Sequence, residues 1–168
     1  MIITKTSKDI KPVLMHPKVR PIKNPYYLIT DDGQTIYVVA PGLNGGEFNK
    51  TVGSISTLEG VTIYQCLFGQ GIFMLQRNDE QEEVKEFKVV TLNSGRQVGI
   101  PAGWVSSLVN VGKSFLVVLK SGPYEENSST SQPIIEKQGL AYYIVEKKGE
   151  ISFEQNPNYS VHPQITTE

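Results

Sequence analysis

Short runs of β-branched and aromatic residues alternate with turn-forming residues along most of this chain. Glycine and asparagine accept the backbone conformations that tight hairpins need, and runs of 4–8 β-prone residues between them are typical of strands. Between the turns, no segment in the middle of the chain keeps a helical period. The sequence therefore predicts an antiparallel, all-β sandwich or barrel. The clearest turn signals are Asp32-Gly33, Gly69-Gln70-Gly71, Asn93-Ser94-Gly95 and residues 110–113.

Length and charge exclude several classes of protein. The chain has 168 residues, which suits one domain that buries its own core. Its 16 basic and 17 acidic residues give a net charge of -1, so no clustered basic excess favours nucleic acid or a membrane surface. Cys66 is the one cysteine and excludes an internal disulfide. No signal peptide or membrane-spanning run is recognisable, so we expect a cytoplasmic protein.

The two ends of the chain differ in composition from its middle. Residues 1–25 are polar and contain four prolines, each of which removes a backbone donor and favours extended geometry. We expect an N-terminal arm over 1–25 with an edge strand at 10–15, a barrel over 26–160, and a tail over 161–168. Residues 121–132 are polar and predict the longest and most mobile loop. Residues 134–140 leave open a short helix or irregular structure.

A spaced motif near the middle of the chain carries information about the fold. Gly95, Pro101, Gly103 and Asn110 fit the pattern G-x5-P-x-G-x2-H-x3-N, with Ser106 in place of the histidine. Gly95 permits a turn, and Pro101 with Gly103 permits the bend that brings the next strand into the barrel mouth. The pattern resembles the second signature of the cupins, which implies a double-stranded β-helix, or jelly-roll, barrel.

A longer collinear resemblance narrows the family. The stretches PGLNGGEFNKTVGSIS, LFGQGIFMLQ, IPAGWVSSLVNVG and IIEKQGLAYYIVEKKGEI follow one another in this order. They resemble segments of the archaeal-type, cupin-fold glucose-6-phosphate isomerases over residues 34–159. The resemblance implies a single-domain cupin barrel. For an active member it also implies aldose–ketose isomerisation of glucose 6-phosphate through an enediolate.

The resemblance also implies where a metal would be held. The family places one divalent metal on three histidines and a glutamate, and these positions fall on Ser54, Ser56, Thr62 and Ser106. Zinc, iron and manganese need imidazole, carboxylate or thiolate ligands, and a neutral hydroxyl is also a poor general base. We therefore expect four degenerate metal positions, no metal and no other cofactor. The catalytic residues of an isomerase are unknown from the sequence.

Few residues are available to replace the missing metal ligands and the missing general base. His16 and His162 lie in the two tails and are expected to be exposed. Glu59 precedes a strand in a loop and is a poor substitute for the base. A Gly-His-Asp-Tyr element that the family carries near its substrate is replaced here by Asn-Ser-Ser-Thr-Ser at residues 127–131. Part of the sugar-positioning set is therefore missing as well.

Four further residues are candidates for ligand binding. Thr51 and Gly53 match the segment with which the family contacts phosphate, because a hydroxyl and an unhindered N–H suit an anion. As alternatives, Thr51 is an ordinary strand residue and Gly53 a bulge. Tyr64 should face the same way as Thr62 and either bind a ligand or fill the barrel. Trp104 either stacks on a sugar or packs in the core, and Cys66 is expected to be a small buried residue.

Three functions stay open at this point. The first is a divergent, metal-free relative that binds a small phosphorylated or hydroxylated ligand in the barrel. The second is an active phosphosugar isomerase that uses other residues, and the third is a structural or dimerisation module. Because all four expected metal ligands and the expected base are replaced, the sequence favours a protein that is not an enzyme. The expected partner is a phosphosugar or another small anion, with no nucleic acid or membrane, and a homodimer stays open.

Overall fold

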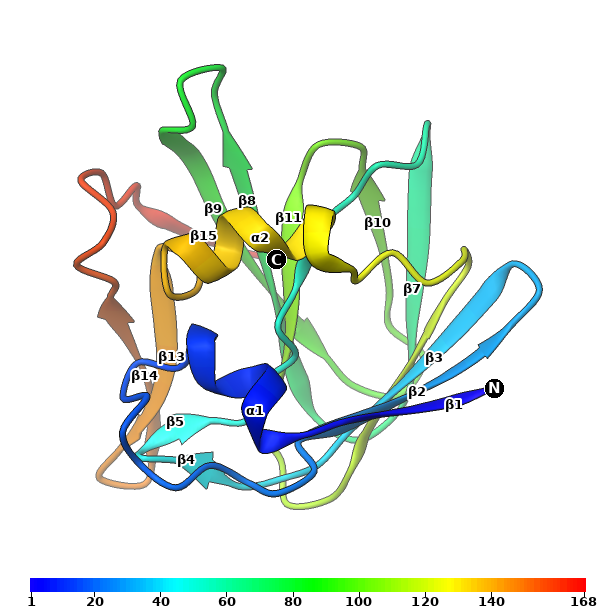
Figure 1. Ribbon diagram of the computed structural model, residues 1–168, viewed down its shortest axis with the longest axis horizontal. Coiled ribbons are helices and arrows are strands. Elements are labelled where there is room, and N and C mark those ends of the chain that lie inside the picture. Colours follow the sequence, from blue (N-terminus) through cyan, green and yellow to red (C-terminus); the bar gives the residue numbers. More distant parts are fainter.

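The computed structural model describes residues 1–168, apart from the side chain of Ser128. It confirms the expected all-β barrel, in which every strand pair except one at the C-terminus is antiparallel (Figure 1). The helices are α1 (Ser7–Ile10), the 3₁₀ helix η1 (Lys11–Val13) and α2 (Ser128–Glu136). The six-stranded sheet contains, in spatial order, β1 (Ile2–Lys5), β2 (Tyr26–Asp31), β3 (Gln34–Val39), β12 (Leu116–Lys120), β7 (Val61–Phe68) and β10 (Gln97–Pro101).

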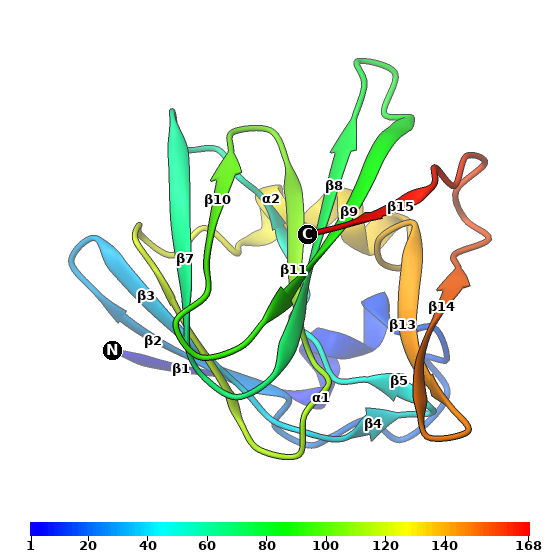
Figure 2. The same ribbon diagram turned by 180° about the vertical axis from the view of Figure 1, so that it is seen from behind.

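Two further sheets complete the molecule. The five-stranded sheet contains β15 (Ile165–Thr167), β9 (Val84–Leu92), β8 (Gly71–Asn78), β11 (Val105–Asn110) and β6 (Ser54–Ile55). The four-stranded sheet contains β14 (Glu150–Gln155), β13 (Tyr142–Lys147), β5 (Glu47–Phe48) and β4 (Leu43–Asn44). The six- and five-stranded sheets lie around the barrel interior, and β13 and β14 lie on the side away from β2 and β3 (Figures 1 and 2).

Alternating burial along the strands builds the core. In β3 and β12 every second side chain is buried, which is the pattern of strands with one face toward the interior. Most of these inward side chains are apolar, with Thr35 and Lys120 as the polar exceptions, and a buried valine or leucine contributes roughly 1.5–3 kcal/mol when it leaves water. The core therefore fills most of the space between the two larger sheets. Its fully buried members include Tyr26, Phe73, Phe87, Ile100 and Leu108.

The N-terminal region is folded against the barrel, and the strand expected at residues 10–15 is wrong. That stretch lies in α1 and η1, while the strand of this region is β1, which pairs with β2. A capping box begins the helix, because the Thr6 N–H donates to Asp9 Oδ2 at 2.8 Å. Ile10, Val13 and Leu14 are fully buried, and their i, i+3, i+4 spacing is that of one helical face.

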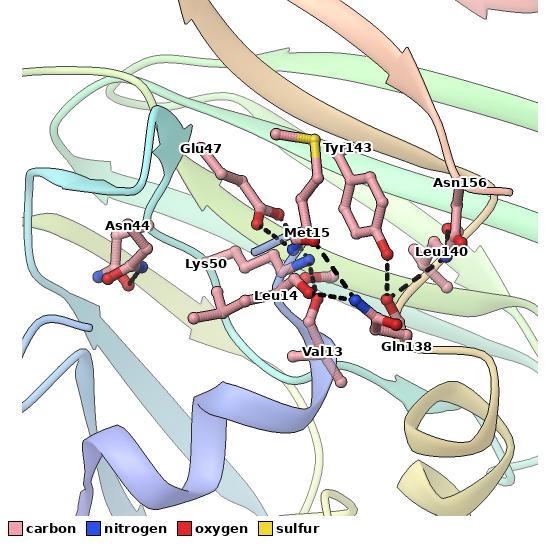
Figure 3. Close-up of polar contacts among 12 residues, drawn as sticks. Val13, Leu14, Met15, Asn44, Glu47, Lys50, Gln138, Leu140, Tyr143 and Asn156 are labelled. Atoms are coloured by element: carbon pink, nitrogen blue, oxygen red, sulfur yellow. Dashed lines mark hydrogen bonds and ion pairs between the residues drawn. The ribbon is translucent and has the colours of Figure 1, made fainter. Parts of the chain in front are cut away.

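A buried network of polar side chains fixes this N-terminal region (Figure 3). Lys50 Nζ lies 2.7 Å from Glu47 Oε2 and donates to the Val13 carbonyl at 2.7 Å. Glu47 Oε1 accepts from the Met15 N–H at 2.8 Å, and Lys50 Nζ also lies 4.9 Å from the centre of the Tyr143 ring. Both charged side chains are almost fully buried, so each depends on the other for compensation.

The segment that composition marked as a long loop contains a helix. Residues 121–132 were expected to form one loop, but α2 begins at Ser128 and extends to Glu136. Asn127 caps it, because Asn127 Oδ1 accepts from the N–H groups of Ser129 and Thr130 at 3.0 and 3.2 Å. Ser131 Oγ donates to the Gly53 carbonyl at 2.7 Å, which fixes α2 over β6. No helix among the described residues is long and apolar enough to cross a membrane.

The C-terminal tail also contributes to the sheet. β15 pairs with β9 in parallel, from Ile165 opposite Phe87 to Thr167 opposite Val89. His162 was expected to be exposed, but it is half-buried, and its Nε2 lies 2.7 Å from the Asn156 carbonyl oxygen. Its ring also packs against Tyr142, with 5.7 Å between the centroids. His16, in contrast, is exposed.

Candidate functional site

A small cavity lies between the six- and five-stranded sheets and brings together five of the eight expected site residues. They are Thr51, Gly53, Ser54, Tyr64 and Ser106. Tyr37, Phe73, Ser107, Leu108 and Glu126 complete its walls. The cavity volume is about 10 Å³, which is room for about one water molecule. The interior of this barrel is therefore nearly filled.

The degenerate metal positions meet only in part. Ser54 and Ser106 are paired residues of β6 and β11, and both line the cavity. Ser56 and Thr62 are buried but are not part of the cavity wall. Ser56 Oγ has no hydrogen-bond partner in the part of the chain that the structure describes. Two of the four residues thus line the cavity together, and the other two are not part of its wall.

The donor set does not fit a transition metal. All four positions carry neutral hydroxyls, which are poor ligands for zinc, iron or manganese. Within the described residues, no three histidine, cysteine, aspartate or glutamate side chains come together in a metal-binding group. Glu59 is exposed in the loop before β7, away from the cavity wall. The residues present therefore supply no metal centre for a proton transfer.

The retained Thr51 and Gly53 each have a partner within the fold. Thr51 Oγ1 accepts from the Leu108 N–H at 3.0 Å, and Ser107 Oγ donates to the Thr51 carbonyl at 2.7 Å. Gly53 has a φ of 91°, and a Cβ at this position would lie 2.6 Å from the Ser106 carbonyl oxygen. Only glycine fits such a close approach of two backbones. The fold thus requires glycine at position 53, and the Thr51 hydroxyl already has a partner within the fold.

The two aromatic candidates occupy different places. Tyr64 is buried in the cavity wall beside Ser106, and its ring packs edge-on against Phe73 with 4.8 Å between the centroids. Trp104 is half-buried on the outside of the barrel, in a surface groove formed mainly by β9 and the C-terminal tail. Lys88 Nζ lies 6.0 Å from the centre of its ring. The Trp104 side chain is therefore not part of the cavity wall, although the Trp104 carbonyl accepts from the Ser56 N–H at 2.9 Å.

Glu126 is the residue that sequence reasoning missed. Its carboxylate lines the cavity with only 3% of the side chain exposed, accepts a short hydrogen bond from Tyr26 Oη, and lies 3.7 Å from Lys5 Nζ. Burial raises the pKa of Glu126 to about 7, against the lowering effects of Tyr26, Lys5 and the Gly53 backbone. The polar segment 121–132 gave no sign of burial, because acidic residues between prolines and serines are typical of solvated loops.

The neighbouring Glu125 is buried in a different environment. Lys120 Nζ lies 2.6 Å from Glu125 Oε2, and the N–H and hydroxyl of Thr57 donate to Oε1 at 2.9 and 2.7 Å. Although burial opposes the charge, these hydrogen bonds lower the pKa of Glu125 below its ordinary range. Two adjacent carboxylates therefore have pKa values that are shifted in opposite directions. Glu125 fixes the segment, and Glu126 carries the titratable group of the cavity.

These features define a class of protein: a single-domain cupin barrel with a nearly filled interior, whose small cavity is lined by hydroxyls and one buried carboxylate. A family profile described as glucose-6-phosphate isomerase (GPI) matches residues 5–162. The chain therefore belongs to the cupin-type glucose-6-phosphate isomerase family. A search of curated proteins finds no match.

Solved structures with similar folds include cupins of different sequence. Drosophila melanogaster CENP-C bound to CAL1 is 11% identical, with 62% of this chain and 78% of that chain covered and a TM-score of 0.48. The Drosophila melanogaster CENP-C cupin domain is 12% identical over 69% of this chain and 94% of that chain, with a TM-score of 0.44. Oxalate oxidase with the substrate analogue glycolate is 17% identical over 53% of this chain and 41% of that chain, with a TM-score of 0.39.

Proposed function

We propose that this protein is a divergent, metal-free member of its family that binds a small phosphorylated or hydroxylated ligand inside the barrel and does not isomerise it. The observation that carries the proposal is the cavity wall. Hydroxyls of Thr51, Ser54, Tyr64 and Ser106 surround it, and the metal-ligating side chains of the family are replaced. Hydroxyls can donate to and accept from a sugar or a phosphate without a metal.

Binding in this cavity requires movement. Pockets for small organic ligands usually measure about 300–1,000 Å³, whereas this cavity holds about 10 Å³. Glu126 lines the same cavity as Thr51 and Gly53, the residues that the family resemblance assigns to phosphate binding. An anionic ligand at that position must displace Glu126, because two unscreened negative charges repel each other strongly in a buried site. Residues 124–127, which precede α2, are the segment that has to move.

Glu126 should take up a proton before or during this movement. Below a pH of about 7 the buried Glu126 is protonated in the folded protein, so its charge no longer opposes an incoming anion. We expect the affinity for a sugar phosphate to rise as the pH falls from 8 to 6. A neutral sugar should show little of this dependence. The pH profile thus distinguishes binding beside Glu126 from binding elsewhere on the surface.

Calorimetry on the purified protein tests the proposal. Glucose 6-phosphate, fructose 6-phosphate, glucose and inorganic phosphate are titrated into the wild type and into the Ser54→Ala and Ser106→Ala variants. Loss of one hydrogen bond should weaken binding by about 0.5–1.5 kcal/mol. Ser160→Ala removes an exposed hydroxyl from the segment after β14, away from the cavity wall, and serves as the matched control. If none of these compounds binds, or if Ser160→Ala weakens binding equally, the proposal is wrong.

One observation favours the alternative of an active isomerase. A carboxylate with a pKa near 7 is suited to act as a general base, and Glu126 is the one cavity residue with this property. For this alternative, interconversion of glucose 6-phosphate and fructose 6-phosphate would be measured by NMR on the same samples. Turnover that is lost in Glu126→Gln and kept in Glu59→Gln would support the isomerase and exclude the binding protein.

A further inference from the structure

A buried ion pair joins the N-terminal strand to the candidate site. β1 runs beside β2 at the edge of the six-stranded sheet, with Lys5 directly opposite Tyr26 (Figure 1). Directly opposed residues of an antiparallel pair have their side chains on the same face. Lys5 Nζ lies 3.7 Å from Glu126 Oε1, and Tyr26 Oη donates to the same oxygen. One cation and one hydroxyl from two paired strands therefore converge on a single carboxylate.

Both donors are held in place by contacts that do not involve this carboxylate. Tyr26 is fully buried, and its Oη also accepts from the Val52 N–H at 3.2 Å. Lys5 is fixed by the pairing of β1 with β2, and its Nζ lies 5.7 Å from the centre of the Tyr124 ring. An ammonium over an aromatic face is attracted by the ring. The two donors therefore form a prearranged site for an oxyanion, and Glu126 supplies that oxyanion in the present structure.

The Lys5 ammonium has unused capacity for hydrogen bonds. Lys120, the other lysine of this region, donates to the Pro123 carbonyl at 2.8 Å and lies 2.6 Å from Glu125 Oε2. Among the described residues, Glu126 is the one ion-pair partner of Lys5, and their separation of 3.7 Å is too long for a hydrogen bond. A lysine ammonium can donate three hydrogen bonds. Lys5 is also 18% exposed, so an anion from solvent can reach it before it reaches the buried carboxylate.

Glu126 also connects the two donors with the hydroxyl-lined cavity. Its side chain is part of the cavity wall together with Ser54 and Ser106, whereas Lys5 and Tyr26 are not part of that wall. Glu126 contacts both donors, so removal of its carboxylate would open the cavity toward them. The donors and the hydroxyls would then face one continuous space. A ligand that fills this space needs one anionic group and neighbouring hydroxyl groups.

We propose that Lys5 and Tyr26 form a carboxylate subsite, which Glu126 fills until the carboxylate of a small hydroxylated acid replaces it. The inference rests on the proposed function, because it assigns the charged group of the ligand that binds in the same cavity. The subsite already holds a carboxylate, and its single ammonium balances one negative charge, whereas a phosphate monoester carries about 1.5–2 charges at pH 7. Because the cavity measures only about 10 Å³, the acid has to be small.

Calorimetry with lactate, lactamide and inorganic phosphate tests the subsite in the wild type and in Glu126→Ala. Lactamide has nearly the shape of lactate without its charge. The backbone beside Glu126 is fixed by Glu125, which accepts from Thr57, and by Thr130, which donates to the Glu125 carbonyl, so Glu126→Ala should keep the segment in place. Glu126→Ala should bind lactate at least about 10-fold more tightly than the wild type and at least about 10-fold more tightly than lactamide.

A second substitution tests the role of Lys5. In the Glu126→Ala background, Lys5→Met should weaken lactate binding at least about 10-fold and leave lactamide binding unchanged, because a charge-assisted hydrogen bond is lost. Lys8→Met is the matched control, since Lys8 is an exposed lysine of α1 in the same N-terminal region. It should change the affinity for neither compound.

The outcomes separate this inference from the proposed function. Equal affinity of Glu126→Ala for lactate and lactamide, tighter binding of phosphate than of lactate, or equal effects of Lys5→Met and Lys8→Met overturns the subsite. The proposed function then still stands if glucose 6-phosphate binds the wild type and depends on Ser54. If the wild type binds none of the compounds but Glu126→Ala binds lactate through Lys5, the subsite is supported and the proposed function is wrong.

NMR on the wild type decides the inference if Glu126→Ala does not fold. Addition of lactate should shift the backbone amide signals of Lys5 and Val52, because both lie beside the carboxylate that lactate replaces. The same concentration of lactamide should leave these signals unchanged. No shift with lactate, or the same shift with both compounds, overturns the subsite.

Discussion

Replacing Glu126 with glutamine should change how the stability of the protein depends on pH. In the folded state burial raises the pKa of Glu126 to about 7, whereas the unfolded chain should show the ordinary value of 4.5. Between these two pH values the folded protein holds a proton that the unfolded chain releases. Stability therefore falls as the pH rises through this window. This shift in pKa makes the free energy of unfolding about 3 kcal/mol lower at pH 8 than at pH 4.5.

In Glu126→Gln the side chain is neutral at every pH and can still accept from Tyr26 Oη. The free energy of unfolding of the variant should therefore lose the decline between pH 4.5 and 7. At pH 8 the variant should be more stable than the wild type by up to about 3 kcal/mol, while the two proteins should be similar near pH 4.5. Urea unfolding followed by fluorescence of the single tryptophan measures both profiles.

Two carboxylates provide controls for this experiment. Glu59→Gln removes the same charge from an exposed loop and should leave the wild-type profile almost unchanged. Glu125→Gln should destabilise the protein by about 3–5 kcal/mol at neutral pH, because it leaves the buried Lys120 without its partner. Parallel pH profiles for the wild type and Glu126→Gln would refute the reasoning, since Glu126 would then not be the buried group that titrates.

Two further substitutions test how the fold supports the site. Lys50→Met should destabilise the protein by about 3–5 kcal/mol by leaving Glu47 buried and unpaired, and the double change with Glu47→Gln should recover much of this loss, as measured by urea unfolding. Lys50→Met should also be cleaved faster by protease within residues 11–23. If the single and double variants were equally stable, the proposed dependence of Glu47 on Lys50 would be wrong. Gly53→Ala should cost about 1–3 kcal/mol because its Cβ would clash with the Ser106 carbonyl at a positive φ, and an unchanged melting temperature would show that the backbones can separate.

The sequence predicted the barrel well because its signals were local. The strands on either side of Asp32-Gly33 and Gly69-Gln70-Gly71 follow from turn chemistry, and the spacing of Gly95, Pro101 and Gly103 indicated the cupin arrangement. The N-terminal helix was missed although its capping residues Thr6 and Asp9 are present. Four prolines suggested an extended arm, but burial of one apolar face against the barrel decided the local structure.

The candidate site was harder to predict, because its main features depend on contacts far apart in the chain. Glu126 reaches the cavity only because Glu125 pairs with Lys120 and because α2 is fixed over β6. Neither contact has a signature in local composition. Local sequence also could not predict where the Trp104 side chain points, because an aromatic residue in such a motif can face inward or outward. Here it lies on the outside of the barrel. Patterns identify strands, but long-range packing decides which side chains meet.

The most direct test of the central claim combines metal analysis with an isomerase assay on one preparation. The protein is expressed in medium supplemented with iron, zinc, manganese and nickel, and its metal content is measured after mild chelation. Interconversion of glucose 6-phosphate and fructose 6-phosphate is followed by NMR before and after each metal is added back. Our account predicts no stoichiometric metal and no interconversion above the buffer rate, because hydroxyls occupy the positions of the family's ligands. One retained equivalent of metal together with metal-dependent turnover would contradict it.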